Sequence, residues 1–204
     1  MSNFNTTKYN ALLVSLWLLS ATGMAATPID QTRSLDPAGR IDIENLKGRI
    51  QVRAWDRAEV KISGTLGEGV ERLIVEGDGQ KLTVKAQYPK NNGWNGAKTG
   101  PTDLLLTVPV RAELEIDSVS ANVDVSGVAP AKLSIDSISG DIAVAGAAPR
   151  EIDVETVSGN VRMTVNSNDV EVQSVSGNLI LRGRMGGEIK TETVSGNIDV
   201  QVNG

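Results

Sequence analysis

The sequence predicts an all-β protein built as a parallel β-helix, a β-solenoid whose coils are about 19 residues long. One motif recurs five times at a nearly constant spacing. The apolar residues are mostly Val, Ile and Leu, and aromatic residues make up only 3% of the chain. β-branched residues suit stacked strands, and beyond the first 26 residues no segment has a convincing helical period. These observations favour stacked β-coils.

Each copy of the motif has a short strand, a Ser, a small residue, an Asn or Asp, and a second short strand. The small residue occurs at positions 121, 140, 159, 177 and 196, so the spacings are 19, 19, 18 and 19. A fixed period of this size indicates coils that stack on one another about 4.8 Å apart. A single coil cannot bury its own apolar edge, so we expect the array to be stable only as a stack.

The first 26 residues are predicted to be a secretory signal peptide. Lys8 precedes an apolar run at 11–21, and Ala25 and Ala26 offer small residues for cleavage. No later apolar stretch is long enough to cross a bilayer. We therefore expect an exported protein without a transmembrane segment after cleavage, most simply in a bacterial periplasm, with secretion or surface attachment as alternatives.

Residues 27–110 are predicted to form the N-terminal β-rich part and cap of the solenoid. Residues 40–52 alternate apolar and polar side chains and resemble a worn copy of the repeat, with Gly48 at the corner. Further short strands are expected at 59–63, 72–76, 81–85 and 103–108. Residues 111–204 form the repeats and continue the same domain. A right-handed coil is expected, because the hexapeptide period of left-handed solenoids is missing.

Alternation within a repeat predicts which side chains face inward and which face outward. The sequence predicts that Ile138, Ile142 and Val144 point into the core together with Leu133 and Ile135 of the preceding strand, and that Ser137 and Ser139 point outward. In the stack, this assignment gives an interior column of equivalent aliphatic residues. Its members are Val119, Ile138, Val157, Val175 and Val194.

The corner of each coil is expected to have a structural role. Glycine allows a positive φ or a close approach between backbones, and stacked Asx side chains can bond one another and the local backbone. A metal ladder is the less favoured alternative, because most members of the Asx column are neutral Asn. The predicted corner residues are Gly140, Gly159, Gly177, Gly196, Asn160, Asn178 and Asn197.

The composition excludes several classes of function. The chain has no Cys and no His, which removes disulfides, thiolate chemistry and the commonest general base. Its formal charge of −5 argues against nucleic acid. No catalytic constellation is visible, and no cofactor is expected.

The Ser-Gly-Asn corners, together with residues 54–60, resemble a bacterial family of adhesin-like β-strand-repeat domains of unknown function, found in exported and envelope proteins. The resemblance covers most of residues 38–204 and implies a parallel β-helix. It transfers no catalytic residues.

We expect a non-catalytic interaction, adhesion or scaffold module that binds an envelope protein, a glycan or another copy of itself. Trp94, in a loop rich in Gly and Asn, is a candidate partner contact. Self-association through an open C-terminal strand edge is also expected.

Two alternatives are a carbohydrate-active enzyme and an ice-binding solenoid. The enzyme would use an outward acidic column, and the ice-binding surface would use paired hydroxyls in 137–139, 156–158 and 193–195. The acidic column consists of Asp117, Asp136, Glu155 and Glu192, interrupted by Gln173.

Overall fold

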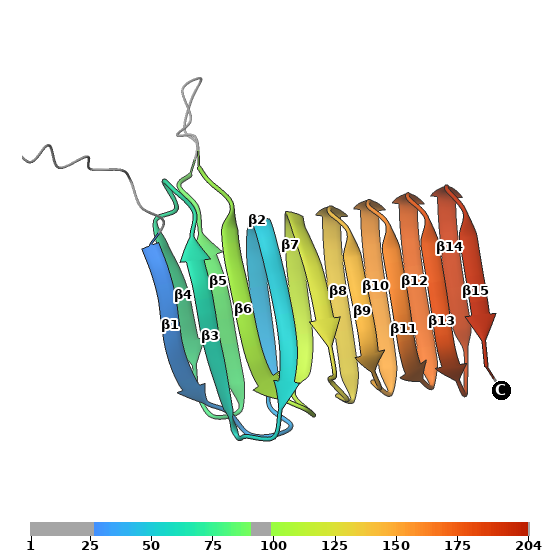
Figure 1. Ribbon diagram of the computed structural model, residues 1–204, viewed down its shortest axis with the longest axis horizontal. Helices are drawn as coiled ribbons and strands as arrows, with labels where there is room; N and C mark the ends of the chain where they lie inside the picture. The colour runs from blue at the N-terminus through green and yellow to red at the C-terminus, as the bar shows by residue number, and fades with distance from the viewer. Residues whose placement is uncertain (1–26, 91–98, 204) are drawn as a thin grey trace, which may run out of the picture.

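The structure, a computed structural model, describes residues 27–90 and 99–203, and these form strands and turns without a helix. Fifteen strands belong to one continuous, mostly parallel sheet. Figure 1 shows them side by side along the long axis, from β1 at one end to β14 and β15 at the other. The predicted signal peptide and Trp94 lie outside the described residues.

The sheet bends into two faces because two long strands run through both of them. The N-terminal halves of β2 (Arg40–Trp55) and β7 (Glu113–Ser126) belong to what we call face 1, and their C-terminal halves belong to face 2. Face 1 also contains β4 (Arg72–Gly77), β5 (Lys81–Gln87), β8 (Lys132–Ser139), β10 (Glu151–Ser158), β12 (Asp169–Ser176) and β14 (Ile189–Ser195). Face 2 also contains β1 (Thr27–Ser34), β3 (Glu59–Leu66), β6 (Thr102–Pro109), β9 (Ile142–Ala147), β11 (Val161–Ser167), β13 (Leu179–Met185) and β15 (Ile198–Val202).

Successive coils stack in parallel and in register. On face 1, Asp117 pairs with Asp136, Asp136 with Glu155, and Glu155 with Gln173. The worn copy of the repeat at residues 40–52 is also a coil, because β2 lies parallel to β7 and Gly48 pairs with Ala121 at the corner. At the N-terminal end the pattern changes: β1, β3 and β6 pair antiparallel, and so do β4 and β5.

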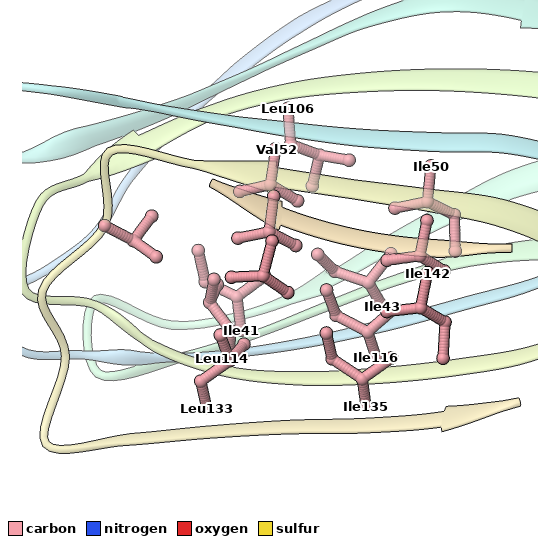
Figure 2. Packing of buried hydrophobic residues seen from close by; sticks show 14 of the residues in the cluster. Ile41, Ile43, Ile50, Val52, Leu106, Leu114, Ile116, Leu133, Ile135 and Ile142 are labelled. Carbon is pink, nitrogen blue, oxygen red and sulfur yellow. The ribbon is translucent and has the colours of Figure 1, made fainter. Parts of the chain in front are cut away.

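The core lies between the two faces and is almost entirely aliphatic. Figure 2 shows two rows on face 1, Ile41–Leu114–Leu133 and Ile43–Ile116–Ile135, facing residues such as Val52, Leu106 and Ile142 on the other side. All of these side chains are at most 2% exposed. Each coil adds the same few residues to every row, so neighbouring coils bury one another's edges.

The predicted interior positions are only partly correct. Leu133, Ile135, Ile142 and Val144 are buried as expected. The assignment of the column at 119, 138, 157, 175 and 194 to the core is wrong: these side chains are 39%, 52%, 48%, 49% and 83% exposed. The physical reason lies in the bend. The chain turns at Gly140–Asp141, so the alternation that holds after the corner cannot be continued back through it.

Alternation along β8 decides which residues point inward before the corner. It directs Leu133, Ile135 and Ser137 to the core, and the Ser137 side chain is only 6% exposed. Ile138, the next residue, points to the outside. The prediction that Ser137 faces solvent is wrong for the same reason.

Candidate binding groove

A long groove runs along the outer surface of face 1. Its volume is about 1660 Å³, and strands from both ends of the solenoid contribute to its lining. Two parallel rows of side chains define it. The apolar row consists of Leu46, Val119, Ile138, Val157, Val175 and Val194. The acidic row consists of Glu44, Asp117, Asp136, Glu155, Gln173 and Glu192.

The two rows follow from the stacking of identical repeats. Four of the five repeats place an acid, a hydroxyl residue and an aliphatic residue in sequence, as in Asp136, Ser137 and Ile138 on β8, and the other repeat has Gln173 in place of the acid. The first and third point outward because side chains alternate along a strand. In-register pairing then repeats the pattern on each neighbouring strand, so six exposed aliphatic residues form a continuous strip. Single exposed aliphatic residues are ordinary, whereas a contiguous apolar strip marks an interaction surface.

The carboxylates in the middle of the acidic row repel one another. Partial burial, followed by the nearby charges of Glu44 and Asp42, raises the pKa of Asp117 above its ordinary value. Burial likewise raises the pKa of Asp136, with Asp117 and Glu155 adding to the effect. Stacked strands hold the side chains of neighbouring coils close together, and the fold therefore keeps these like charges near one another.

Some face 1 carboxylates are neutralised and others are not. Glu44 is paired with Lys85 near the N-terminal end, and Glu171 with Lys190 (2.6 Å) near the C-terminal end. Asp42 is held by Arg40 and Lys81, which lower its pKa against the opposing effect of burial. Among the described residues, no ion pair is formed by the central carboxylates Asp117, Asp136, Asp153 and Glu155.

Between the acidic and the aliphatic residue, each of these strands carries a small hydroxyl residue whose side chain points to the core side of the sheet. Ser137, Thr156 and Ser174 are 5–6% exposed. Their hydroxyl oxygens have no hydrogen-bond partner among the described residues. In the first repeat, by contrast, Ser118 Oγ accepts a hydrogen bond from the backbone N–H of Ala121 and donates to its carbonyl. Burial of Ser137 and Thr156 also removes the flat face of paired hydroxyls that ice binding would need.

The N-terminal end of the groove is held by a fixed polar contact. The hydroxyl of Tyr88 lies 3.0 Å from Asn45 Oδ1 and 3.1 Å from the carbonyl oxygen of Lys47. Asn45 is 3% exposed, and its Nδ2 donates to the carbonyl oxygen of Thr102. The hydroxyl of Tyr88 is therefore already engaged at this end of the groove.

At the corners, glycines bring the backbones of neighbouring coils together. Gly140, Gly177 and Gly196 have φ values of 135°, 153° and 148°. Gly159 does not share this positive φ, but a Cβ on it would lie 2.2 Å from the carbonyl oxygen of Gly140. No side chain fits at such a distance, so close contact between coils explains the glycine at this position.

The Asx residues form a ladder of hydrogen bonds on the outside of the corners. Asp141 Oδ1 accepts from the backbone N–H and the Nδ2 of Asn160, both at 3.1 Å. Asn178 donates in the same way to Asn160, and Asn197 to Asn178. Each rung joins two coils, so this column holds the stack in register.

Other features of the described residues give little evidence for a further binding site. Trp55 is half-buried, its Nε1 donates to the carbonyl oxygen of Glu59, and Arg57 lies over its ring. Within residues 27–90 and 99–203, no group of three or more His, Cys, Asp or Glu residues could hold a metal ion. In the same part of the chain, no helix is long and apolar enough to cross a membrane.

Comparison with known proteins identifies the class. Residues 38–204 match the Toastrack DUF4097 family, and the chain belongs to this family. None of the curated proteins matches the sequence. The match covers the coils that build the groove.

A solved structure shares this fold at low sequence identity. A proposed cell adhesion protein from Clostridium sporogenes is 9% identical, with a TM-score of 0.57, over 87% of this chain and 100% of the other. A proposed adhesin from Parabacteroides distasonis is 10% identical, with a TM-score of 0.46, over 86% of this chain and 97% of the other.

The groove is not among the features that the sequence patterns predict, although the spacing of two residues points to it. Ile135 and Ile138 are an odd number of residues apart, so a single strand cannot direct both of them into the core. The sequence predicts an outward acidic column, and the structure places this column along the groove.

Proposed function

We propose that the protein is an exported, non-catalytic interaction or adhesion module of the bacterial cell envelope, and that it binds its partner in the groove of face 1. The single observation that carries this proposal is the strip of six exposed aliphatic residues stacked on successive coils. Keeping such a strip in water is unfavourable, and a partner that covers it gains the free energy of apolar burial.

Several features support a binding role. The strip is presented by a rigid parallel sheet, so little ordering cost arises when a partner docks. The similar fold from Clostridium sporogenes is described as a proposed cell adhesion protein. Export is supported by the predicted signal peptide at 1–26. In this proposal residues 27–110 cap the N-terminal end, and residues 111–204 extend the same domain.

The acidic row does not favour an enzyme. Its carboxylates recur once per coil as part of the repeat, whereas an active site is normally a unique constellation of different groups. The same periodicity is what an extended contact surface requires. The corner glycines and Asx residues serve this surface by keeping the coils in register.

Binding of the protein to separated envelope fractions of its own bacterium tests the proposal. Two variants are compared with the wild type. The triple variant replaces Ile138, Val157 and Val175 by Ser, and the control variant replaces Thr164 on face 2 by Val to change surface polarity away from the groove. We expect the wild type and the control to be retained by one fraction, and the triple variant to be lost from it. Equal retention of all three proteins would reject the groove as the binding surface.

A further inference from the structure

The charge pattern of face 1 indicates what chemistry the partner offers. Asp117, Asp136, Asp153 and Glu155 cluster on three neighbouring strands and form no ion pair among the described residues, whereas acids nearer both ends of the face are paired with Lys or Arg. Burial raises the pKa of Asp153 as well, with Glu155 and Glu171 adding to it and Lys132 opposing it. Because Lys85 and Lys132 do not cancel the upward shifts of Asp117 and Asp153, cationic groups of a partner placed here would relieve the remaining repulsion.

The uncompensated charge lies beside the apolar row. On β8, Asp136 and Ile138 are two positions apart, so their side chains emerge about 7 Å apart on the same face. The same pair recurs on β10 as Glu155 and Val157. A partner that uses the whole surface must therefore present a row of cations parallel to a row of apolar groups.

The length and spacing of the rows suit a helix. From β2 to β14 the apolar row spans six strands and five intervals, about 24 Å at about 4.8 Å per interval. A helix of about 16 residues has this length, and its pitch of about 5.4 Å is close to the coil spacing. An amphipathic helix also carries a charged flank beside its apolar stripe. An extended segment instead points alternate side chains away from the surface and offers only one row.

We infer that the groove of face 1 binds a basic amphipathic helix of a partner protein, with the apolar stripe of the helix on the apolar row and its Lys or Arg flank on the acidic row. This inference rests on the proposed function. Nucleic acid and anionic lipid surfaces would be repelled by the acidic row. A second copy of this face would set carboxylates against carboxylates. Among the described residues, Tyr88 is the one aromatic residue that lines the groove, and its hydroxyl already bonds Asn45 and Lys47.

The probe that tests the inference is a synthetic 16-residue peptide (about 24 Å as a helix) with a Leu stripe and Lys along one flank. Two control peptides replace every Lys by Glu, or scramble the same composition so that no stripe forms. Fluorescence anisotropy of the labelled peptides measures the dissociation constant for the full chain, and far-UV circular dichroism of the mixture measures helix formation.

The variants separate charge from apolar contact. One carries Asp136→Asn with Glu155→Gln, another Ile138→Ser with Val157→Ser, and the control Asp103→Asn removes one carboxylate from the exposed surface of β6 in face 2. We expect each double variant to weaken binding of the Lys peptide about threefold to tenfold, because partly exposed contacts contribute about 1 kcal/mol or less each. Asp103→Asn should leave the dissociation constant unchanged, and added salt should weaken binding of the wild type. Thermal melts of all variants establish that each is folded.

Two results would overturn the inference: equal affinity for the Lys, Glu and scrambled peptides, or unchanged affinity in both double variants. If the peptide does not bind but envelope retention still depends on the apolar row, the helix inference falls and the proposed function stands. If retention does not depend on the apolar row, the proposed function itself falls.

Discussion

Two substitutions on β10, three residues apart, test which face of the strand is buried. Val154→Asp and Val157→Asp make the same chemical change, but Val154 is 0% exposed in the core and Val157 is 48% exposed in the groove. Full burial of a Val side chain is worth about 1.5–3 kcal/mol. Val157 keeps half of its surface in water, so its replacement forfeits about 1 kcal/mol.

The cost at Val154 is of a different order. An unpaired carboxylate in an aliphatic core costs several kcal/mol in addition to the lost burial of Val, against a total stability of about 5–15 kcal/mol for a typical domain. We therefore expect Val154→Asp to lose cooperative folding. Val157→Asp should lower the melting temperature by only about 2–4 °C for each kcal/mol in a chain of this size.

Urea and thermal denaturation followed by circular dichroism measure both variants against the wild type. Similar midpoints for the two variants, or a larger loss for Val157→Asp, would refute the assignment of the apolar row to the outside of face 1. A cooperative transition for Val157→Asp close to that of the wild type supports it.

Three further outcomes are expected. Gly159→Ala should lower the free energy of unfolding by about 1–3 kcal/mol, because its Cβ would lie 2.2 Å from a backbone oxygen. Ser158→Ala, at an exposed position, should change this free energy by less than about 0.5 kcal/mol. Equal urea midpoints for the two variants would contradict the close contact between coils. Asp136→Asn should stabilise the protein at pH 7, because folding raises the pKa of Asp136 and the ionised carboxylate therefore opposes folding. This gain in stability should shrink as the pH falls through the raised pKa, and it should vanish below the unfolded value of 3.8. A gain that persists in acid would disprove this cause. The outer edges of β14 and β15 pair with no strand among the described residues, so we propose that the protein self-associates through these edges. Light scattering should detect this association, and Asp199→Pro should reduce it. A wild type that scatters as a monomer at micromolar concentration would reject the proposal.

The stacking of coils could be predicted from the sequence because it depends on period alone. The five Ser-X-Asx corners recur at spacings that in-register pairing requires, and Gly48 disclosed the earlier coil in β2. The family resemblance rests on the same residues.

The faces could not be assigned fully because alternation is a property of one strand and the corner separates two. Ile142 and Val144 lie after the bend and point inward, and continuing their alternation backward placed Ile138 inside as well. The alternation of β8 before the corner instead places Ser137 inside with Leu133 and Ile135, and the period of the repeat alone does not show at which residue one strand ends and the next begins. The groove follows from this reversal, and so it was missed.

Cysteine labelling tests most directly whether the apolar row forms an accessible groove. The chain contains no Cys, so Val157→Cys and Val154→Cys each introduce a single thiol into an otherwise thiol-free protein. In native protein, we predict that an alkylating reagent modifies Val157→Cys at a rate close to that of the unfolded chain, and that the Lys peptide slows this reaction. Val154→Cys should react only at the rate at which the coils open. Equal native rates at the two positions, or a protected thiol at 157 in the free protein, would contradict the account.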